Sequence, residues 1–252
     1  MRRMRLFARR NIKEMLRDPL GCFFFAGFPV LMLLLFTIIQ SNTPEKIPFF
    51  EIPSLLPGII VFAYTFVMLY TALLVSKDKS TAFLIRLYAS PMRPSNCIFG
   101  YAAPGLLIGI LQTFICFATG NLILLCQKAS LLSFHTMLSV TITSIPVLLL
   151  FVGLGIFFGS AFSEKAAPGV SSIVISLSGI LSGAWMPLQT MGKLEQIASF
   201  LPFYPAVRMG RHFTEAAGTT FLRDLLVVLI YLVLVFVIAI LAFRHTIKND
   251  NR

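Results

Sequence analysis

The chain has 252 residues, of which 57% are hydrophobic and only 12% are Asp, Glu, Lys or Arg. A soluble domain has about 25% charged residues, so this composition leaves too little charge to coat a water-facing surface. The net charge of +11 is concentrated at the N-terminus and in one loop, and no basic globular domain is present to bind nucleic acid. We therefore expect an integral membrane protein that contacts anionic membrane lipid and no nucleic acid.

The first 19 residues form a basic segment ahead of the first apolar run. Apolar residues recur every three or four positions and define one helical stripe: Met1, Met4, Ala8, Ile12 and Met15. A second stripe of the same period is basic: Arg2, Arg5, Arg9, Lys13 and Arg17. This pattern predicts an amphipathic interfacial helix over 1–19 that ends at Asp18-Pro19. A plain positive anchor for the next helix is the alternative.

Six apolar runs are each long enough to cross the roughly 30 Å hydrocarbon core of a bilayer. They cover about residues 20–39, 55–75, 98–126, 134–162, 168–187 and 225–243. No small-x-small cleavage pattern follows the first run, so we expect a retained transmembrane helix rather than a signal peptide. The sequence thus predicts an all-α integral membrane fold with six transmembrane helices, in a single domain over residues 1–252.

Lys and Arg are distributed unevenly between the two sets of connections. Seven precede the first span, four lie between the second and third, one follows the fourth and three follow the sixth, so that 15 of 21 share one side. Because basic loops stay in the cytoplasm, both termini and the loop at 76–97 are predicted to be cytoplasmic. The loop at 188–224 is then external, and we expect the charges of 188–217 to be solvated: Lys193, Glu195, Arg208, Arg211 and Glu215.

The residues that catalysis or nucleotide binding would need are missing. Gly100 and Gly105 have the spacing of a phosphate-binding loop, but Leu106 and Leu107 stand where Lys and Ser or Thr are required. The spans contain almost no Asp, Glu or His, which ion-coupled transporters and intramembrane enzymes use. We therefore expect no catalytic site, no metal site and no bound ATP in this chain, and an energy source outside it.

The cytoplasmic loop contains a candidate docking helix at 81–91, which Pro91 ends. Aromatic and aliphatic side chains share one face of this helix: Phe83, Leu84, Leu87 and Tyr88. A short helix that exposes such a face is typical of a docking surface. Packing of the same face onto the helical bundle or onto lipid is the alternative.

In this order, the features resemble the permease subunits of ABC-2 type exporters, including drug and antibiotic exporters. The resemblance rests on the N-terminal helix, on LYASP at 87–91, on SGAWMP at 182–187, and on 194–201 with PFYPAVR at 202–208. The last pair resembles the family's external helical re-entrant segment before the final span. The chain departs from the family at Ile85, because an acidic residue often precedes the Arg in that region. It departs again at Pro202-Phe203, where Asn-Pro is common.

The resemblance implies a bacterial, multi-pass protein of the cytoplasmic membrane. Its complex would contain two ABC ATPase subunits, which bind ATP and Mg, and a second permease half that is identical or homologous. ATP hydrolysis by the complex would drive alternating access and export of a drug, antibiotic, peptide or lipid-like molecule. The residues expected to couple to the ATPase are Thr81, Phe83, Leu84, Arg86, Leu87, Tyr88, Ser90 and Pro91.

The resemblance also places the second and fifth spans at the axis of a permease dimer. Residues expected to line a central cavity are Phe62, Phe66, Met68, Tyr70, Ile175, Ser176 and Ser178. Such an apolar lining with a few hydroxyls suits a hydrophobic or amphipathic substrate. The G-x-x-x-G pair Gly179 and Gly183 is the expected dimer contact. The expected external gate consists of Trp185, Met186, Pro187, Pro202, Phe203 and Tyr204.

The sequence leaves other functions open. A sodium-extruding or polysaccharide-exporting relative would share the same architecture. A non-transport polytopic protein, such as an assembly factor or the membrane domain of a sensor, is a second alternative. A secondary transporter and an intramembrane enzyme are disfavoured by the missing ionisable groups. Co-purification of an ATPase distinguishes the exporter from the others.

Overall fold

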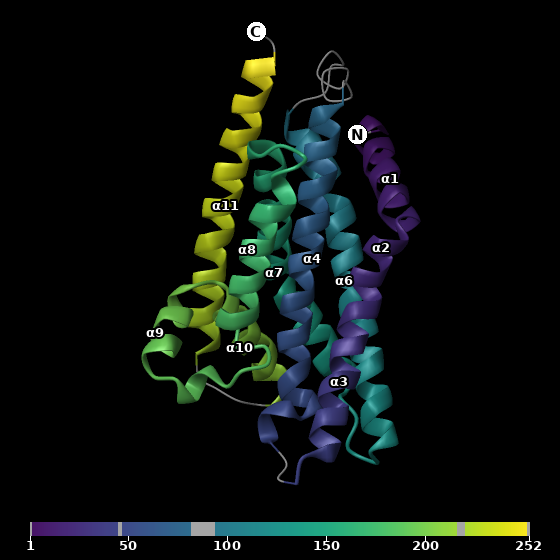
Figure 1. Cartoon of the computed structure of the whole chain (residues 1–252), viewed down its shortest axis with the longest axis vertical. Coiled ribbons are helices and arrows are strands. Elements are labelled where there is room, and N and C mark those ends of the chain that lie inside the picture. The colour runs from purple at the N-terminus through teal and green to yellow at the C-terminus, as the bar shows by residue number, and fades with distance from the viewer. Residues whose placement is uncertain (1, 45–46, 82–93, 216–219, 251–252) are drawn as a thin grey trace.

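The computed structural model describes residues 2–44, 47–81, 94–215 and 220–250, and every regular element within them is helical (Figure 1). In chain order the elements are α1 (Arg2–Arg17), α2 (Pro19–Cys22), the π-helix η1 (Phe23–Gly27), α3 (Phe28–Asn42), the short 3₁₀ helix η2 (Pro48–Phe50), α4 (Ile52–Ser80), α6 (Pro94–Cys126), α7 (Phe134–Ala161), α8 (Ala167–Leu181), the short 3₁₀ helix η3 (Leu188–Thr190), α9 (Lys193–Phe200), α10 (Phe203–Thr214) and α11 (Phe221–Asp250). The predicted all-α membrane fold is confirmed, and α1 ends where Asp18-Pro19 predicts.

Within the described part of the chain, five helical stretches are long and apolar enough to cross a membrane. They cover Phe23–Asn42, Ile52–Ser80, Cys97–Cys126, Phe134–Ala161 and Phe221–Ala242. These stretches match the first four and the last of the six predicted spans to within a few residues.

The predicted fifth span is shorter than expected. α8 has 15 residues, which is about 22 Å at 1.5 Å per residue, whereas the hydrocarbon core is about 30 Å thick. The helix ends at Leu181 because Gly183 adopts a φ of +65°, which a right-handed helix cannot contain. The range 168–187 is therefore corrected to a short apolar helix followed by a turn.

α4 is the central helix of the bundle. In its most apolar stretch 83% of the residues are buried, against 17% in α11. α7 packs closely on it, because a Cβ added at Gly155 would lie 2.5 Å from the Met68 carbonyl oxygen and one at Gly159 would lie 2.5 Å from Val75 Cβ. The small residues of α7 thus join two helices of the same chain.

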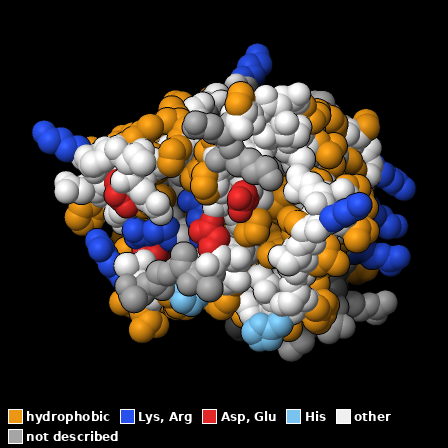
Figure 2. Space-filling model, turned by 90° about the horizontal axis from the view of Figure 1, so that it is seen from below, with side chains coloured by type: hydrophobic (Ala, Val, Ile, Leu, Met, Phe, Trp, Pro, Cys, Tyr) orange, Lys and Arg blue, Asp and Glu red, His pale blue; other side chains and the backbone are white. Residues whose placement is uncertain are grey.

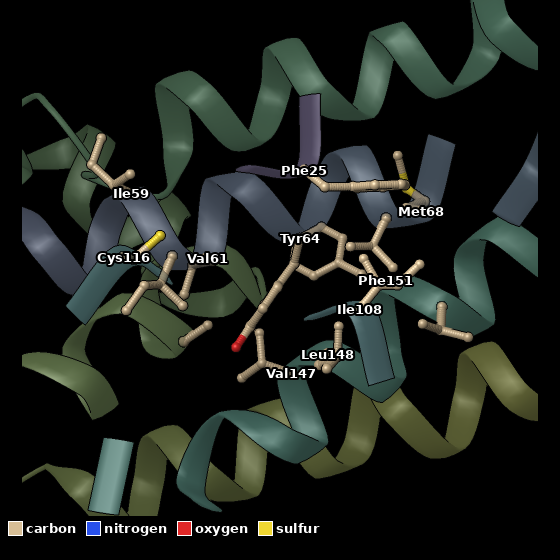
Figure 3. Packing of buried hydrophobic residues seen from close by; sticks show 14 of the residues in the cluster. Phe25, Ile59, Val61, Tyr64, Met68, Ile108, Cys116, Val147, Leu148 and Phe151 are labelled. Carbon is tan, nitrogen blue, oxygen red and sulfur yellow. The ribbon is translucent and has the colours of Figure 1, made fainter. Parts of the chain in front are cut away.

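The main core lies between α4, α6 and α7 (Figure 3). Tyr64 is fully buried among apolar side chains. Its hydroxyl lies 2.6 Å from Thr113 Oγ1 on α6 and 3.0 Å from Ser144 Oγ on α7. A buried hydroxyl needs hydrogen-bond partners, so this one group orients three helices relative to one another.

The two ends of the bundle carry different elements. Both chain termini, the C-terminal end of α4 and the start of α6 lie at one end, while α9 and α10 lie at the other (Figure 1). The two termini therefore lie at the same end of the bundle, as the even number of predicted spans requires.

Candidate functional site

The last turn of α4 holds α1 in place through two salt bridges. Asp78 is only 2% exposed and accepts hydrogen bonds from Arg10 of α1 at 2.8 Å and from the Tyr101 hydroxyl of α6 at 2.9 Å. Lys77 forms a second salt bridge with Glu14 of α1, with 2.7 Å between nitrogen and oxygen. Burial acts to lower the pKa of Arg10, but its hydrogen bond to Asp78 and the nearby acidic charges outweigh burial and raise that pKa.

The same turn of α4 also holds α7 and the turn that follows it. Lys79 Nζ donates a hydrogen bond to the Ser160 carbonyl at 2.7 Å, and the Ser80 hydroxyl donates to the Glu164 carboxylate at 2.8 Å. We call residues 77–80 the α4 end cluster. Its four consecutive side chains contact α1, α6, α7 and the α7–α8 turn, so a displacement of this turn would reach all four segments.

Among the residues expected to couple to an ATPase, Thr81 is the one that the described ranges include. It is exposed, and its N–H donates a hydrogen bond to the Lys77 carbonyl at 3.1 Å, which ends α4 directly after the end cluster. The others lie outside the described residues, and their role stays a prediction: Phe83, Leu84, Arg86, Leu87, Tyr88, Ser90 and Pro91.

α1 buries a face rotated from the predicted apolar stripe. Phe7, Asn11 and Met15 are buried, whereas Ala8 of the predicted stripe is only half-buried. Asn11 Nδ2 donates a hydrogen bond to the Gly100 carbonyl of α6 at 3.2 Å. A Cβ at Gly100 would lie 2.2 Å from the Phe7 ring. The glycine on α6 therefore decides which face of α1 packs inward.

An aromatic cluster joins α4, α8 and the first span. Phe62 and Phe66 project from neighbouring turns of α4 and are almost fully buried. The ring of Trp185 meets Phe62 edge-on at 4.4 Å, and Phe24 stacks on Phe66 at 5.0 Å. Ile175 packs against the same cluster. Three of the predicted cavity residues are therefore neighbours, and the surface that they form is apolar.

The other predicted cavity residues lie elsewhere. Met68 is buried in the main core, and the Tyr70 hydroxyl donates to the Glu14 carbonyl of α1 at 3.3 Å. Ser176 is exposed. Ser178 is fully buried, and its hydroxyl has no hydrogen-bond partner among the described residues. The structure thus does not bring all seven residues into one cavity, and their contact with a substrate stays a prediction.

The predicted dimer pair does not share a helical face. Gly179 lies in α8, where a Cβ would be 3.0 Å from the Trp185 ring, whereas Gly183 lies beyond the end of that helix. A Cβ at Gly183 would meet the Tyr204 ring at 3.2 Å. Both glycines therefore contact residues of their own chain, and a role in dimer contact stays a prediction.

Arg211 fastens the turn after α8 to the start of α4. It is 6% exposed and donates hydrogen bonds to the Gly183 carbonyl at 2.8 Å and to the Ser54 carbonyl at 2.9 Å. Burial lowers the pKa of this guanidinium. The expectation that the charges of 188–217 are solvated is therefore wrong for Arg211.

The six predicted gate residues occupy two segments at the end of the bundle that carries α9 and α10. The turn after α8 contains Trp185, Met186 and Pro187, which are half-buried. Pro202, directly before α10, and Phe203 and Tyr204 in its first turn are buried. The two segments meet where Gly183 faces the Tyr204 ring. The structure thus brings the two halves of the predicted gate together, and their opening stays a prediction.

Charged side chains surround a cavity of about 180 Å³ between α9, α10 and the start of α11. Arg208 forms a salt bridge with Asp224, which is 1% exposed. The Arg208 guanidinium also lies over the Tyr204 ring, 4.6 Å from the ring centroid. The Tyr204 hydroxyl donates a hydrogen bond to the Glu195 carboxylate at 3.1 Å. Figure 2 shows acidic and basic side chains gathered around a hollow in this face.

Two of the residues that organise these sites carry no motif in the sequence. Asp78 lies between two lysines at the end of an otherwise uncharged span, and that isolated acid is the one available signal. Arg211 lies in a segment of mixed polarity, and no neighbouring residue in the sequence indicates that its side chain is buried.

Comparison with protein-family models matches residues 2–214 to the family described as ABC-2 type transporter. The matched range includes α1, the α4 end cluster, the aromatic cluster and α10, and it stops before α11. A search of curated proteins finds no significant match to the chain.

Proposed function

This chain belongs to the ABC-2 type transporter family, and from that membership we propose that it is the permease subunit of an exporter of hydrophobic or amphipathic molecules. The family implies an ABC ATPase as partner. We further propose two ATPase copies that bind ATP and Mg, and a second permease half that is identical or homologous. The substrates are drugs, antibiotics, peptides or lipid-like molecules, and export from a bacterial cytoplasmic membrane would confer antibiotic resistance by multidrug efflux.

The α4 end cluster is the observation that carries the proposed mechanism. The segment expected to receive the ATPase begins at Thr81, directly after this cluster. Residues 77–80 contact α1, α6, α7 and the α7–α8 turn at the same time. A push on the segment would therefore move these elements together, because packed helices respond to a displacement as rigid units.

The aromatic cluster supports the proposed class of substrate. Its Phe62, Phe66 and Trp185 side chains provide an apolar wall on α4 and the turn after α8, which favours ligands with large apolar surfaces. Opening of the external end would separate Trp185 from Phe62 and expose this wall. The charged groups around Arg208 and Asp224 would then form the polar rim of the exit.

Co-purification of the partner ATPase tests this function. Membranes from cells that express the affinity-tagged chain are solubilised, and the purified material is assayed for a stoichiometric ATPase subunit and for ATP hydrolysis. We expect both, and we expect both to be lost in the Leu87→Asp/Tyr88→Asp variant.

The matched control is Gln127→Asp/Ser130→Asp, which adds the same charge to exposed positions at the other end of the bundle. It should retain the ATPase. An ATPase that stays bound to the Leu87→Asp/Tyr88→Asp variant would contradict the docking site. Substrate transport by the chain alone, without ATP, would contradict the function itself.

A further inference from the structure

A groove along α1 carries an excess of positive charge. It has a volume of about 690 Å³ and lies between α1 and α4, where it is lined by Leu6, Arg9, Arg10, Lys13, Glu14, Arg17, Asp18, Tyr70 and Lys77. Five of these side chains are basic and two are acidic. The groove therefore favours an anionic ligand over a neutral or cationic one.

The cations of this groove fall into two groups. Arg10 and Lys77 are paired with acidic residues of the chain. Arg9, Lys13 and Arg17 lie one turn apart along α1 and are exposed, and none of them forms a salt bridge in the described part of the chain. Their charges are therefore available to a ligand.

An apolar cleft continues from the cationic groove. Its volume is about 100 Å³, and it is lined by Asp18, Gly21, Phe24, Phe25, Phe66, Leu69, Tyr70 and Leu73. Asp18 and Tyr70 line both spaces, so the two are adjacent. The cleft lies between the π-helix η1 and α4. Gly21 allows the chain before η1 to lie close to α4, because a Cβ there would lie 2.9 Å from the Tyr70 ring.

We propose that the groove and the cleft together bind one anionic phospholipid. The headgroup phosphate lies against Arg9, Lys13 and Arg17, and one acyl chain enters the cleft beside Phe24 and Leu73. A free phosphate would use the cationic half alone, and a neutral apolar molecule would use the apolar half alone. A phospholipid with a net negative charge matches both halves and their order along the helix.

The bound lipid would connect α1 to the first span and to α4. Its phosphate would contact α1, whereas its acyl chain would contact η1 and α4. Lipid binding would therefore reinforce the attachment of α1 that the Arg10–Asp78 and Lys77–Glu14 pairs provide in the same groove. This proposal does not depend on transport or on an ATPase.

Native mass spectrometry of the full chain, purified in detergent and stripped of lipid, tests the proposal. The probes are dioleoylphosphatidylglycerol, dioleoylphosphatidylcholine and inorganic phosphate. We expect one phosphatidylglycerol to bind saturably, with phosphatidylcholine at least tenfold weaker and inorganic phosphate without detectable binding. Equal binding of the two lipids would overturn the charge selectivity. Inorganic phosphate that displaces phosphatidylglycerol would show an ion site and would also overturn the proposal.

Two variants test the two halves separately. The triple variant Arg9→Gln/Lys13→Gln/Arg17→Gln should bind phosphatidylglycerol about a hundredfold more weakly. Each basic group near an anionic headgroup contributes about a factor of five to the affinity. The matched control Lys128→Gln/Lys165→Gln/Lys193→Gln removes the same charge from exposed positions outside the groove and should bind as the parent does. Equal losses in the two triple variants would show general charge attraction and overturn the site.

Leu73→Trp should fill the apolar cleft and lower the affinity for phosphatidylglycerol at least tenfold, with no change in the charge of the chain. Leu226→Trp, on an exposed face of α11, is its control and should have no effect. Thermal unfolding of each variant without lipid checks that it is folded. If the triple variant is not folded, the Leu73→Trp variant alone tests the proposal. An unchanged lipid affinity of Leu73→Trp would then overturn it.

Discussion

Asp78 places a carboxylate at the end of a membrane-spanning helix and gives it donors from two other helices. Asp78→Asn keeps the size of the side chain but removes the charge that pairs with Arg10. We expect the free energy of unfolding to fall by about 2 kcal/mol, because hydrogen bonds to charged groups contribute about 1.5–3 kcal/mol. Thermal unfolding in detergent measures the loss, and faster trypsin cleavage within α1 reports its release.

Glu164→Gln is the control for Asp78→Asn. It makes the same chemical change at an exposed acid in the α7–α8 turn. Exposed pairs contribute about 0–1 kcal/mol, so its melting temperature should stay close to that of the parent. Equal melting temperatures and equal cleavage rates for the two variants would contradict the role assigned to Asp78.

Arg211 uses the shape of its guanidinium as well as its charge. Its Nη2 and Nε atoms each reach a carbonyl, one from Gly183 and one from Ser54. A lysine cannot reproduce this fork. Arg211→Lys should therefore lower stability by about 2 kcal/mol, which corresponds to about 4–8 °C in the melting temperature of a chain of this size. Arg223→Lys, at an exposed position, should change the melting temperature by no more than about 2 °C.

At the scale of elements, α4 and α7 pack without space for added atoms. A Cβ at Gly159 would lie 2.6 Å from the Ala72 carbonyl oxygen, which is backbone and cannot rotate away. Gly159→Ala should therefore destabilise the chain by about 1–3 kcal/mol through overpacking. Thermal unfolding in detergent is the measurement.

Gly169→Ala is the matched control for Gly159→Ala. Gly169 lies in α8, and a Cβ there would have no neighbour within 4 Å. Since Ala is favoured over Gly in a helix by about 1 kcal/mol, this variant should be as stable as the parent or more so. A Gly159→Ala variant as stable as Gly169→Ala would contradict the close packing of α4 and α7.

At the scale of the whole molecule, the bundle has two ends that differ in charge and in structure. We expect the end with both termini to face the cytoplasm. Single cysteines at Lys165→Cys and Lys193→Cys, in a chain whose four native cysteines are replaced by Ser, test this orientation with a membrane-impermeant thiol reagent. In intact cells Lys193→Cys should be labelled and Lys165→Cys should not, whereas both should react in permeabilised cells. The reverse pattern in intact cells would invert the assigned topology.

The sequence by itself determined the class of the molecule and the approximate extent of most spans. Both follow from local properties, because the length of an apolar run and the Lys and Arg around it decide how a segment partitions into a bilayer. The end of α1 at Asp18-Pro19 was likewise predictable, since proline disfavours the helical conformation of the residue before it. The end of the predicted span 168–187 was placed too late, because the apolar sequence continues past Leu181 whereas the backbone turns at Gly183.

The tertiary structure alone decided which polar residues are buried and which residues meet. Asp78 and Arg10 are 68 positions apart in the chain, and Arg211 and Ser54 are 157 apart. The periodicity of one helix shows its apolar face but not the residue opposite, so the contact of Phe7 with Gly100 could not be read from α1. Local pattern therefore specifies the helices, and the packing of distant segments specifies the α4 end cluster and the buried charges.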